Sequence, residues 1–200
     1  NGALAGIINA VSSDNGPVLN DGYYDDAVEK LGDHTPSGGL RGGKYSLFEA
    51  GTRVPFITYW KGKIKPQISD ELVTQIDFLE SFSSLLGSGI NSKDGFDLSD
   101  VFFRNKGKGR TEFVLEATSR TAFRQNNWVM IPPYKGPALN NSVNIEVGNS
   151  KKYLLFDLDS DLAQKNDLSK KNPEKLQEMI KRYGEITGDD LGEVEELILE

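Results

Sequence analysis

Two pieces of sequence decide the fold of this 200-residue chain: SDNGP at residues 13–17 and GLRGGKYSLFEAGTRVP at residues 39–55. A short apolar stretch, Ile7–Ser12, precedes the first piece, and an aromatic, β-branched stretch, Val54–Trp60, begins within the second. Both stretches have the composition of strands, the first of them buried. The two pieces are therefore expected in loops at strand ends, where α/β sheets collect their ligands.

Asp14 and Asn15 place a carboxylate and an amide carbonyl directly after the first predicted strand. Hard cations such as Ca²⁺ prefer oxygen ligands of this kind. Asp-Asn-Gly is also an ordinary turn sequence, so a purely structural role is the alternative. Two side chains cannot complete a site of six to eight ligands, and further ligands would have to come from elsewhere.

Lys44 follows two glycines, and the run from Gly38 to Lys44 fits the start of a nucleotide-binding P-loop. That interpretation fails, because Tyr45 stands where a Ser or Thr is needed and no hydrophobic strand precedes Gly38. Glycines still let a ligand approach the backbone, and a lysine supplies a point charge for an oxyanion. The alternative is an ordinary surface lysine in a loop.

His34 is the only histidine and lies in the long polar segment 16–46, where a functional loop is expected. It could contact or protonate a bound ester, or it could be incidental. Glu49 and Arg53 bracket Gly51, and we expect them to form a structural ion pair at the base of the loop.

The net charge of −7 is concentrated at one end of the chain, since residues 185–200 hold seven acids and no base, which leaves 23 acids and 23 bases elsewhere. Without a basic stripe, nucleic-acid binding is disfavoured. Without cysteine, disulfides, thiolate metal sites and a cysteine nucleophile are excluded. No apolar run approaches the ~20 residues of a membrane span.

The rest of the chain has clear helix and strand signals. A helix is predicted over residues 77–86, with Asp77 as N-cap, Glu80 completing a capping box and Gly87 as the stop. Another should open at Asn172-Pro173, present an apolar face and end at Gly184, and residues 191–198 have helical spacing. A small antiparallel sheet is expected from the stretches 112–117, 121–125, 128–132 and 153–158.

Taken together, these segments resemble the C-terminal part of a type I sulfatase, the arylsulfatase family of the alkaline phosphatase superfamily. The resemblance covers about residues 7–184, and its specificity comes from the order and spacing of pieces that are individually weak. The matching pieces are SDNGP at 13–17, LRGGK at 40–44, EAGTRVP at 49–55, WKGKI at 60–64, SDELV at 69–73, QIDFL at 75–79, YLLFDL at 153–158 and residues 161–168. Leu162 departs from the proline that is usual there.

The resemblance implies an α/β fold: the C-terminal part of an alkaline-phosphatase-like mixed sheet, followed by a small antiparallel sheet and a C-terminal helix. It implies three parts, with residues 1–110 in the catalytic α/β domain, 111–184 in a small α+β subdomain and 185–200 as an acidic tail. It also implies roles in sulfate-ester hydrolysis. Asp14 and Asn15 fall on Ca²⁺-binding positions, Lys44 on the lysine that holds the substrate sulfate, and His34 in a loop that often lines the substrate pocket.

One departure bears on activity. The family's nucleophile is a formylglycine made within a Cys/Ser-x-Pro-x-Arg motif, which does not occur here. We therefore expect a fragment that is inactive alone, with the N-terminal region of the same protein as its missing partner. The substrate of the parent would be a sugar or aryl sulfate, and the family resemblance suggests a periplasmic or secreted protein.

Two alternatives stay open: a non-catalytic sulfatase-like binding or structural module, and a phosphoester-hydrolysing relative in the same superfamily. A fragment would also expose apolar surface and is expected to self-associate through it.

Overall fold

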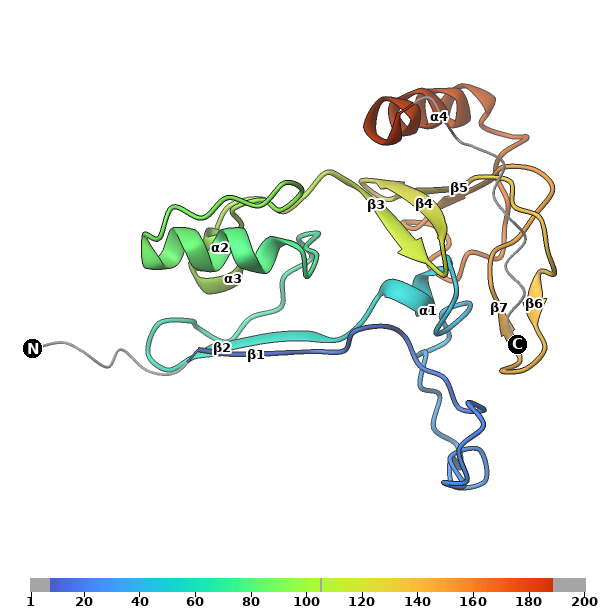
Figure 1. Ribbon diagram of the computed structural model, residues 1–200, viewed down its shortest axis with the longest axis horizontal. Helices are drawn as coiled ribbons and strands as arrows, with labels where there is room; N and C mark the ends of the chain where they lie inside the picture. Colours follow the sequence, from blue (N-terminus) through green and yellow to red (C-terminus); the bar gives the residue numbers. More distant parts are fainter. Residues whose placement is uncertain (1–7, 105, 189–200) are drawn as a thin grey trace, which may run out of the picture. The chain divides into compact units, whose positions relative to one another are not determined.

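The computed structural model describes residues 8–104 and 106–188, and Figure 1 shows the course of the chain. Residue contacts divide it into two compact units, one formed by residues 1–12 and 55–111 and the other by residues 13–54 and 112–200. The second unit thus combines the sequence pieces at 13–17 and 39–54 with the later sheet. The division expected from the family resemblance, with residues 1–110, 111–184 and 185–200 as separate parts, remains a prediction.

In the first unit, β1 (Ile8–Ser12) pairs antiparallel with β2 (Phe56–Trp60), with Val11 opposite Ile57. The helices α2 (Asp77–Leu86) and α3 (Ser99–Arg104) supply most of the aromatic core that packs on Phe56 and Trp60. The predicted strands are confirmed, but the burial expected for the first is wrong. Four of its five residues are exposed. Within the described residues, β1 pairs with β2 alone, and the aromatic core of this unit packs on Ile8 at the start of the strand.

The start of α2 also differs from prediction. Asp77 is the first helical residue, and the N-cap position is Ile76, which makes no side-chain cap bond. The Asp77 carboxylate is turned to Thr74, Phe96 and Arg110 instead, since a buried arginine competes for it. At the other end, Gly87 has the expected left-handed conformation and ends the helix, with its N–H bonded to the Ser84 carbonyl at 3.2 Å.

The second unit is built on the predicted antiparallel sheet. Its four strands lie in the order β3-β4-β5-β8, and two further short strands, β6 and β7, pair with each other. Their bounds are β3 Glu112–Ala117, β4 Arg120–Gln125, β5 Trp128–Ile131, β6 Leu139–Asn140, β7 Ile145–Glu146 and β8 Leu154–Asp157. The pair β6–β7 had no signal in the sequence, because two-residue strands carry no readable alternation.

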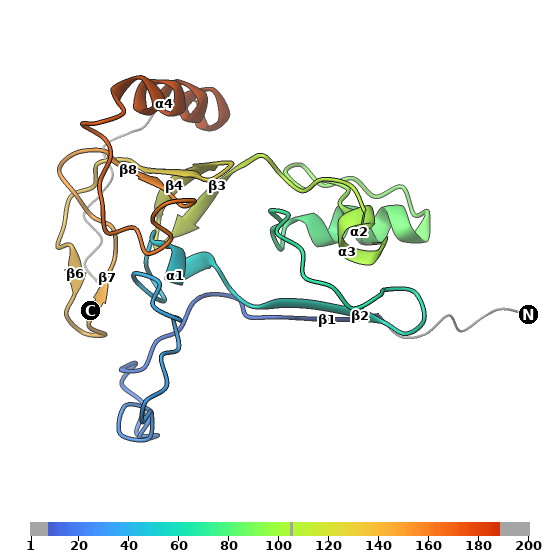
Figure 2. The same cartoon turned by 180° about the vertical axis from the view of Figure 1, so that it is seen from behind.

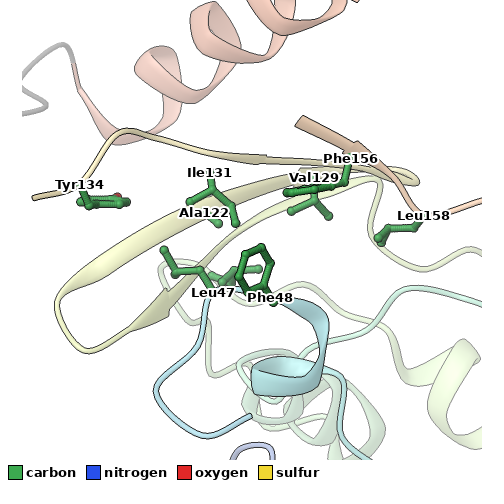
Figure 3. Packing of buried hydrophobic residues seen from close by; sticks show 9 residues of the cluster. Leu47, Phe48, Ala122, Val129, Ile131, Tyr134, Phe156 and Leu158 are labelled. Carbon is green, nitrogen blue, oxygen red and sulfur yellow. The ribbon is translucent and has the colours of Figure 1, made fainter. Parts of the chain in front are cut away.

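The two faces of this sheet are covered by different parts of the chain. Helix α4 (Pro173–Thr187) packs Met179 and Tyr183 against Phe123, Met130 and Leu155 on one face. The residues Leu47 and Phe48, just before α1 (Glu49–Thr52), pack on the other face, as Figure 3 shows. Figure 2 shows α4 and α1 on opposite sides of the sheet.

Helix α4 confirms its predicted apolar face and its first-position proline, but it does not end at Gly184. It continues to Thr187, whose hydroxyl donates to the Tyr183 carbonyl, and Gly188 follows with a positive φ of 85°. Asn172 occupies the N-cap position without a side-chain cap bond. The helix predicted over residues 191–198 lies outside the described residues.

Candidate active site

The two sequence pieces meet in the second unit through their backbones. The Gly16 N–H donates to the Gly51 carbonyl at 2.9 Å, and the Lys44 N–H donates to the Pro17 carbonyl at 2.9 Å. Both bonds require close approach of chain to chain. A Cβ added to Gly16 would lie 1.6 Å from the Ala50 carbonyl oxygen, which no rotation of a side chain could relieve. Glycine is therefore needed at this position for steric reasons.

The turn at residues 13–17 holds both predicted metal ligands. One Asp14 carboxylate oxygen accepts the Asn15 N–H at 3.0 Å, and the Ser13 hydroxyl donates to the Asn15 carbonyl at 2.8 Å. The Asp14 side chain is exposed, and Asn15 is half-buried. Across the described ranges, no group of three or more His, Cys, Asp or Glu could hold a metal ion. The turn thus carries two residues with hard oxygen donors.

Lys44 lies in a turn that the backbone constrains on both sides. Its N–H is bonded to Pro17, and the following residue, Tyr45, has a positive φ of 74°. The half-buried Lys44 places its ammonium 5.5 Å from the centroid of the Tyr45 ring. Turns, rather than a strand, precede Gly38, which agrees with the rejection of a P-loop. The arrangement places the Lys44 backbone beside Pro17, the last residue of the turn that carries the two oxygen donors.

His34 is not brought to this site by any contact that the structure gives. Its side chain is exposed, and its N–H donates to the Leu31 carbonyl at 3.2 Å within the same loop. Figure 1 shows this loop, drawn in blue, extending away from the sheet of the second unit. The ends of the loop are fixed at Pro17 and Lys44, whereas its middle is held mainly by local turns.

The predicted ion pair at the base of the loop is confirmed. Arg53 Nε lies 2.6 Å from Glu49 Oε2, and the Glu49 side chain is only 3% exposed. Two distant residues complete the arrangement: Arg124 approaches the other Glu49 oxygen at 3.6 Å, and the Gln164 side chain accepts the Glu49 N–H at 2.7 Å. Burial lowers the pKa of Arg124, and the charge of Glu49 partly offsets that effect.

Arg41, three residues before Lys44, makes contacts that the sequence did not reveal. Its guanidinium forms a fork with Glu146, with Nε and Oε2 2.6 Å apart, and donates to the Gln164 carbonyl at 2.9 Å. It also stacks on Phe48 at 4.0 Å. The Arg41 hydrogen bond lowers the pKa of Glu146, outweighing the effect of burial. Its two polar partners lie more than 100 positions away, so no local pattern could have identified them.

A cavity of about 310 Å³ lies beside Arg41 and is lined by both signs of charge. Arg41 and Glu146 form one ion pair in its wall, and Lys152 and Asp167 form another at 2.7 Å. Lys165 also lines the cavity, so the wall carries three cationic and two acidic side chains.

Comparison with known proteins identifies the class to which this arrangement belongs. A family model described as "Sulfatase" matches residues 7–88. The N-acetylgalactosamine-6-O-sulfatase of Bacteroides thetaiotaomicron is 38% identical over 172 residues, covering 84% of this chain and 34% of that protein. Human arylsulfatase A is 39% identical over 67 residues, covering 32% of this chain and 13% of that protein.

A solved structure described under the metabolism of multiple glycosaminoglycans by Bacteroides thetaiotaomicron has a similar fold. It matches with a TM-score of 0.84 and 36% identity, covering 90% of this chain and 38% of that chain. The chain belongs to the sulfatase family and has its alkaline-phosphatase-like α/β fold. It spans about a third of the length of the N-acetylgalactosamine-6-O-sulfatase that it matches. Among the described helices, none has the length and apolar character to cross a membrane.

Proposed function

We propose that this chain supplies two calcium ligands, Asp14 and Asn15, and the sulfate-binding Lys44 to a sulfuric ester hydrolase. The observation that carries the proposal is the joining of the two turns. The bonds from Lys44 to Pro17 and from Gly16 to Gly51 hold the two turns that carry the oxygen donors and the lysine in one backbone frame. A frame of that kind suits one bound anion that is shared by a cation and a lysine.

The donor set fits calcium in kind and is incomplete in number. A carboxylate and an amide are hard oxygen ligands, and Ca²⁺ takes six to eight of them. The remaining ligands would come from other parts of the parent protein. When bound, the ion would offset negative charge on the sulfate oxygens. Lys44 would add an ammonium charge that strengthens as charge develops in the transition state.

The nucleophile is the part that this sequence does not contain. In the proposed reaction one hydroxyl of a formylglycine hydrate in the parent protein loses its proton and attacks sulfur, and the bond from sulfur to the ester oxygen breaks, so that the substrate alcohol leaves after taking up a proton. No Cys/Ser-x-Pro-x-Arg motif, in which formylglycine is made, occurs in these 200 residues. The chain alone should therefore not turn over a sulfate ester. Robust activity from the pure chain would overturn this part of the proposal. Export to the periplasm or out of the cell belongs to the same proposal.

For the substrate we propose a sulfated amino sugar. The support is the relative at 38% identity, which is named for sulfate at the 6-position of N-acetylgalactosamine. The arylsulfatase matches are either lower in identity, at 27% over 92% of this chain for arylsulfatase G of Rattus norvegicus, or shorter, at 32% of this chain for the human arylsulfatase A. A comparison of N-acetylgalactosamine 6-sulfate with a generic aryl sulfate, in the full-length protein, tests this choice. A kcat/KM that favours the aryl ester would contradict it.

The decisive experiment replaces Lys44 by alanine in the full-length protein that contains this chain. We expect kcat/KM to fall about a hundredfold or more, as for the loss of a transition-state charge contact. Lys30→Ala is the matched control, since Lys30 is an exposed lysine of the same loop and pairs only locally with Asp26. Wild-type activity in Lys44→Ala would remove this lysine from the site.

Calcium titration separates the proposal from the alternative of a self-sufficient binding module. Two donors should give millimolar or undetectable affinity in the isolated chain. Tight binding, abolished by Asp14→Asn, would mean that these residues complete a site by themselves, and it would favour the module.

A further inference from the structure

Arg120, the first residue of β4, is a buried cation whose partners are neutral. Its side chain is among the buried polar groups, with the residue 6% exposed. One guanidinium nitrogen donates to the Asn149 amide oxygen at 2.5 Å, and another donates to the Tyr45 carbonyl at 3.1 Å and to the Thr118 hydroxyl. Nε lacks a hydrogen-bond partner among the described atoms. Burial also lowers the pKa of Arg120.

The other well-buried arginines of the described chain differ from Arg120 in one respect. Arg110 is paired with the Asp77 carboxylate, and Arg124 approaches Glu49. Burying a cation without a carboxylate costs several kcal/mol, so hydrogen bonds must offset the loss of hydration. An apolar side chain would fill the same space without that cost. The presence of arginine at this position is therefore best explained by the groups to which its guanidinium donates hydrogen bonds.

The guanidinium holds the turn that carries Lys44. Its acceptor, the Tyr45 carbonyl, belongs to the residue directly after Lys44, and Tyr45 has the left-handed backbone that a non-glycine residue rarely adopts. On the other side, the Lys44 N–H is bonded to Pro17. The backbone is thus fixed immediately before and immediately after the lysine side chain.

The guanidinium is itself fixed from the sheet. Asn149 accepts from it and donates in turn to the Pro137 carbonyl at 2.9 Å, and Thr118 belongs to the turn between β3 and β4. A planar fork with several donors can serve three acceptors at once, which the single ammonium of a lysine cannot do with the same geometry. Arginine is therefore suited to connect the sheet to the Lys44 turn.

We propose that Arg120 is a positioning residue for Lys44: it fixes the Tyr45 carbonyl and thereby the direction from which the Lys44 ammonium reaches the sulfate ester. This inference rests on the proposed function, in which Lys44 binds the transferring group. It requires no contact between Arg120 and substrate. Loosening the turn would move the ammonium, and misplacement by about 1 Å can cost on the order of a hundredfold in rate.

The test is a double-mutant cycle in the full-length protein, with kcat/KM for the sulfate ester as the readout. Arg120→Gln should lower kcat/KM by about tenfold or more. The fold-decrease in kcat/KM caused by Lys44→Ala should then be at least about fivefold smaller in the Arg120→Gln background than in the wild type, because a misplaced ammonium contributes less to the reaction. Arg120→Lys keeps the charge without the fork and should not restore activity; full activity there would overturn the inference.

Arg182→Gln is the control for the cycle. Arg182 lies on α4, forms its ion pairs with Glu112 and Glu185, and does not touch the turn. The fold-changes in kcat/KM of Arg182→Gln and Lys44→Ala should multiply in the double mutant to within about twofold, as expected for independent sites. If Arg120→Gln fails to fold, Asn149→Ala removes one support of the guanidinium while keeping Arg120, and the same non-additivity is expected in a cycle with Lys44→Ala.

The outcomes separate this inference from the function on which it rests. If Lys44→Ala lowers activity and the cycles with Arg120 or Asn149 are multiplicative within about twofold, the positioning role is refuted and the proposed function stands. If Lys44→Ala leaves activity unchanged, both are refuted. A clearly reduced cost of Lys44→Ala in the variant backgrounds, with multiplicative behaviour in the Arg182 control, supports the positioning role.

Discussion

Replacing Asp77 by asparagine should strongly destabilise the first unit, because it leaves a buried arginine without its counter-charge. The Asp77 side chain is fully buried and that of Arg110 is 5% exposed. The carboxylate accepts Arg110 Nε at 2.9 Å, the Phe96 N–H at 2.9 Å and the Thr74 N–H at 3.0 Å. Removing one partner of such a pair costs about 3–5 kcal/mol in the free energy of unfolding.

The chain provides a matched control in the same unit. Arg104 and Asp100 are also an arginine–aspartate pair, at 2.8 Å, but both side chains are more than half exposed. Asp100→Asn should cost only about 0.3–0.5 kcal/mol, the usual value for an exposed pair four residues apart on a helix. The two substitutions change the same chemical group, so the difference between them isolates burial.

Urea unfolding measured by tryptophan fluorescence is the assay. Trp60 packs in the aromatic core of the first unit and Trp128 lies in the sheet of the second, so a Trp128→Phe background makes the signal report the first unit. A loss below about 1 kcal/mol for Asp77→Asn, or a loss equal to that of Asp100→Asn, would refute the reasoning.

The same pair predicts a pH dependence. Burial alone would raise the pKa of Asp77, but hydrogen bonds from Arg110 and from the Phe96 and Thr74 amides outweigh it, so its pKa lies below the ordinary value. The unfolded pKa of an aspartate is about 3.9. A carboxylate with a lower pKa in the folded state contributes its full stabilisation above about pH 3.9 and loses that stabilisation as the pH falls through the folded-state pKa. Asp77→Asn should therefore reduce the loss of stability in acid.

Three further predictions concern the site, the second core and the exposed ribbon. Gly16→Ala should disrupt the bond to Gly51 and reduce kcat/KM of the full-length protein at least tenfold. Gly38→Ala should cost less activity: its φ of 61° strains an alanine, but the added Cβ meets nothing within 4 Å. Equal effects of the two substitutions would contradict the role of close approach. Met179→Ala should lower the free energy of unfolding in urea by about 2–5 kcal/mol, because Met179 is fully buried. Ile186→Ala is the control and should cost less than about 0.5 kcal/mol, since Ile186 is 42% exposed. A small loss for Met179→Ala would mean that α4 does not stabilise the sheet. The β1–β2 ribbon exposes apolar side chains: Val11 is 60%, Ile57 61% and Tyr59 54% exposed. The isolated chain should therefore associate in a concentration-dependent way in sedimentation experiments, and Ile57→Lys should weaken that association. A monomer at all concentrations would contradict this prediction.

Much of the fold follows from local signals in the sequence. The stretches 112–117, 121–125 and 128–132 were predicted as strands, and in the structure their burial alternates: Ala122 and Val129 face Leu47, whereas Phe123 and Met130 face α4. Leu176, Met179, Ile180 and Tyr183 predicted the buried face of α4. Such patterns are readable because side-chain direction repeats every two residues in a strand and about every 3.6 in a helix.

Other features had no local signal. The cap expected at Asp77 failed because Arg110, 33 positions later, takes its carboxylate. The exposure of β1 could not be foreseen, because an apolar strand sequence does not say how many neighbours cover it. The partners of Arg41 are likewise invisible in sequence, since their separation of more than 100 residues is set by the path of the chain.

The sequence by itself determined the chemistry of the candidate site: two oxygen donors in SDNGP, one glycine-flanked lysine and no cysteine. It also determined the family resemblance, because the order and spacing of short motifs are written along the chain. Only the tertiary structure decided that the turns at residues 13–17 and 40–46 share one backbone frame, and that a buried arginine from β4 holds the carbonyl beside Lys44. The physical reason is that residue types fix which bonds are possible, whereas packing over long separations fixes which donor meets which acceptor.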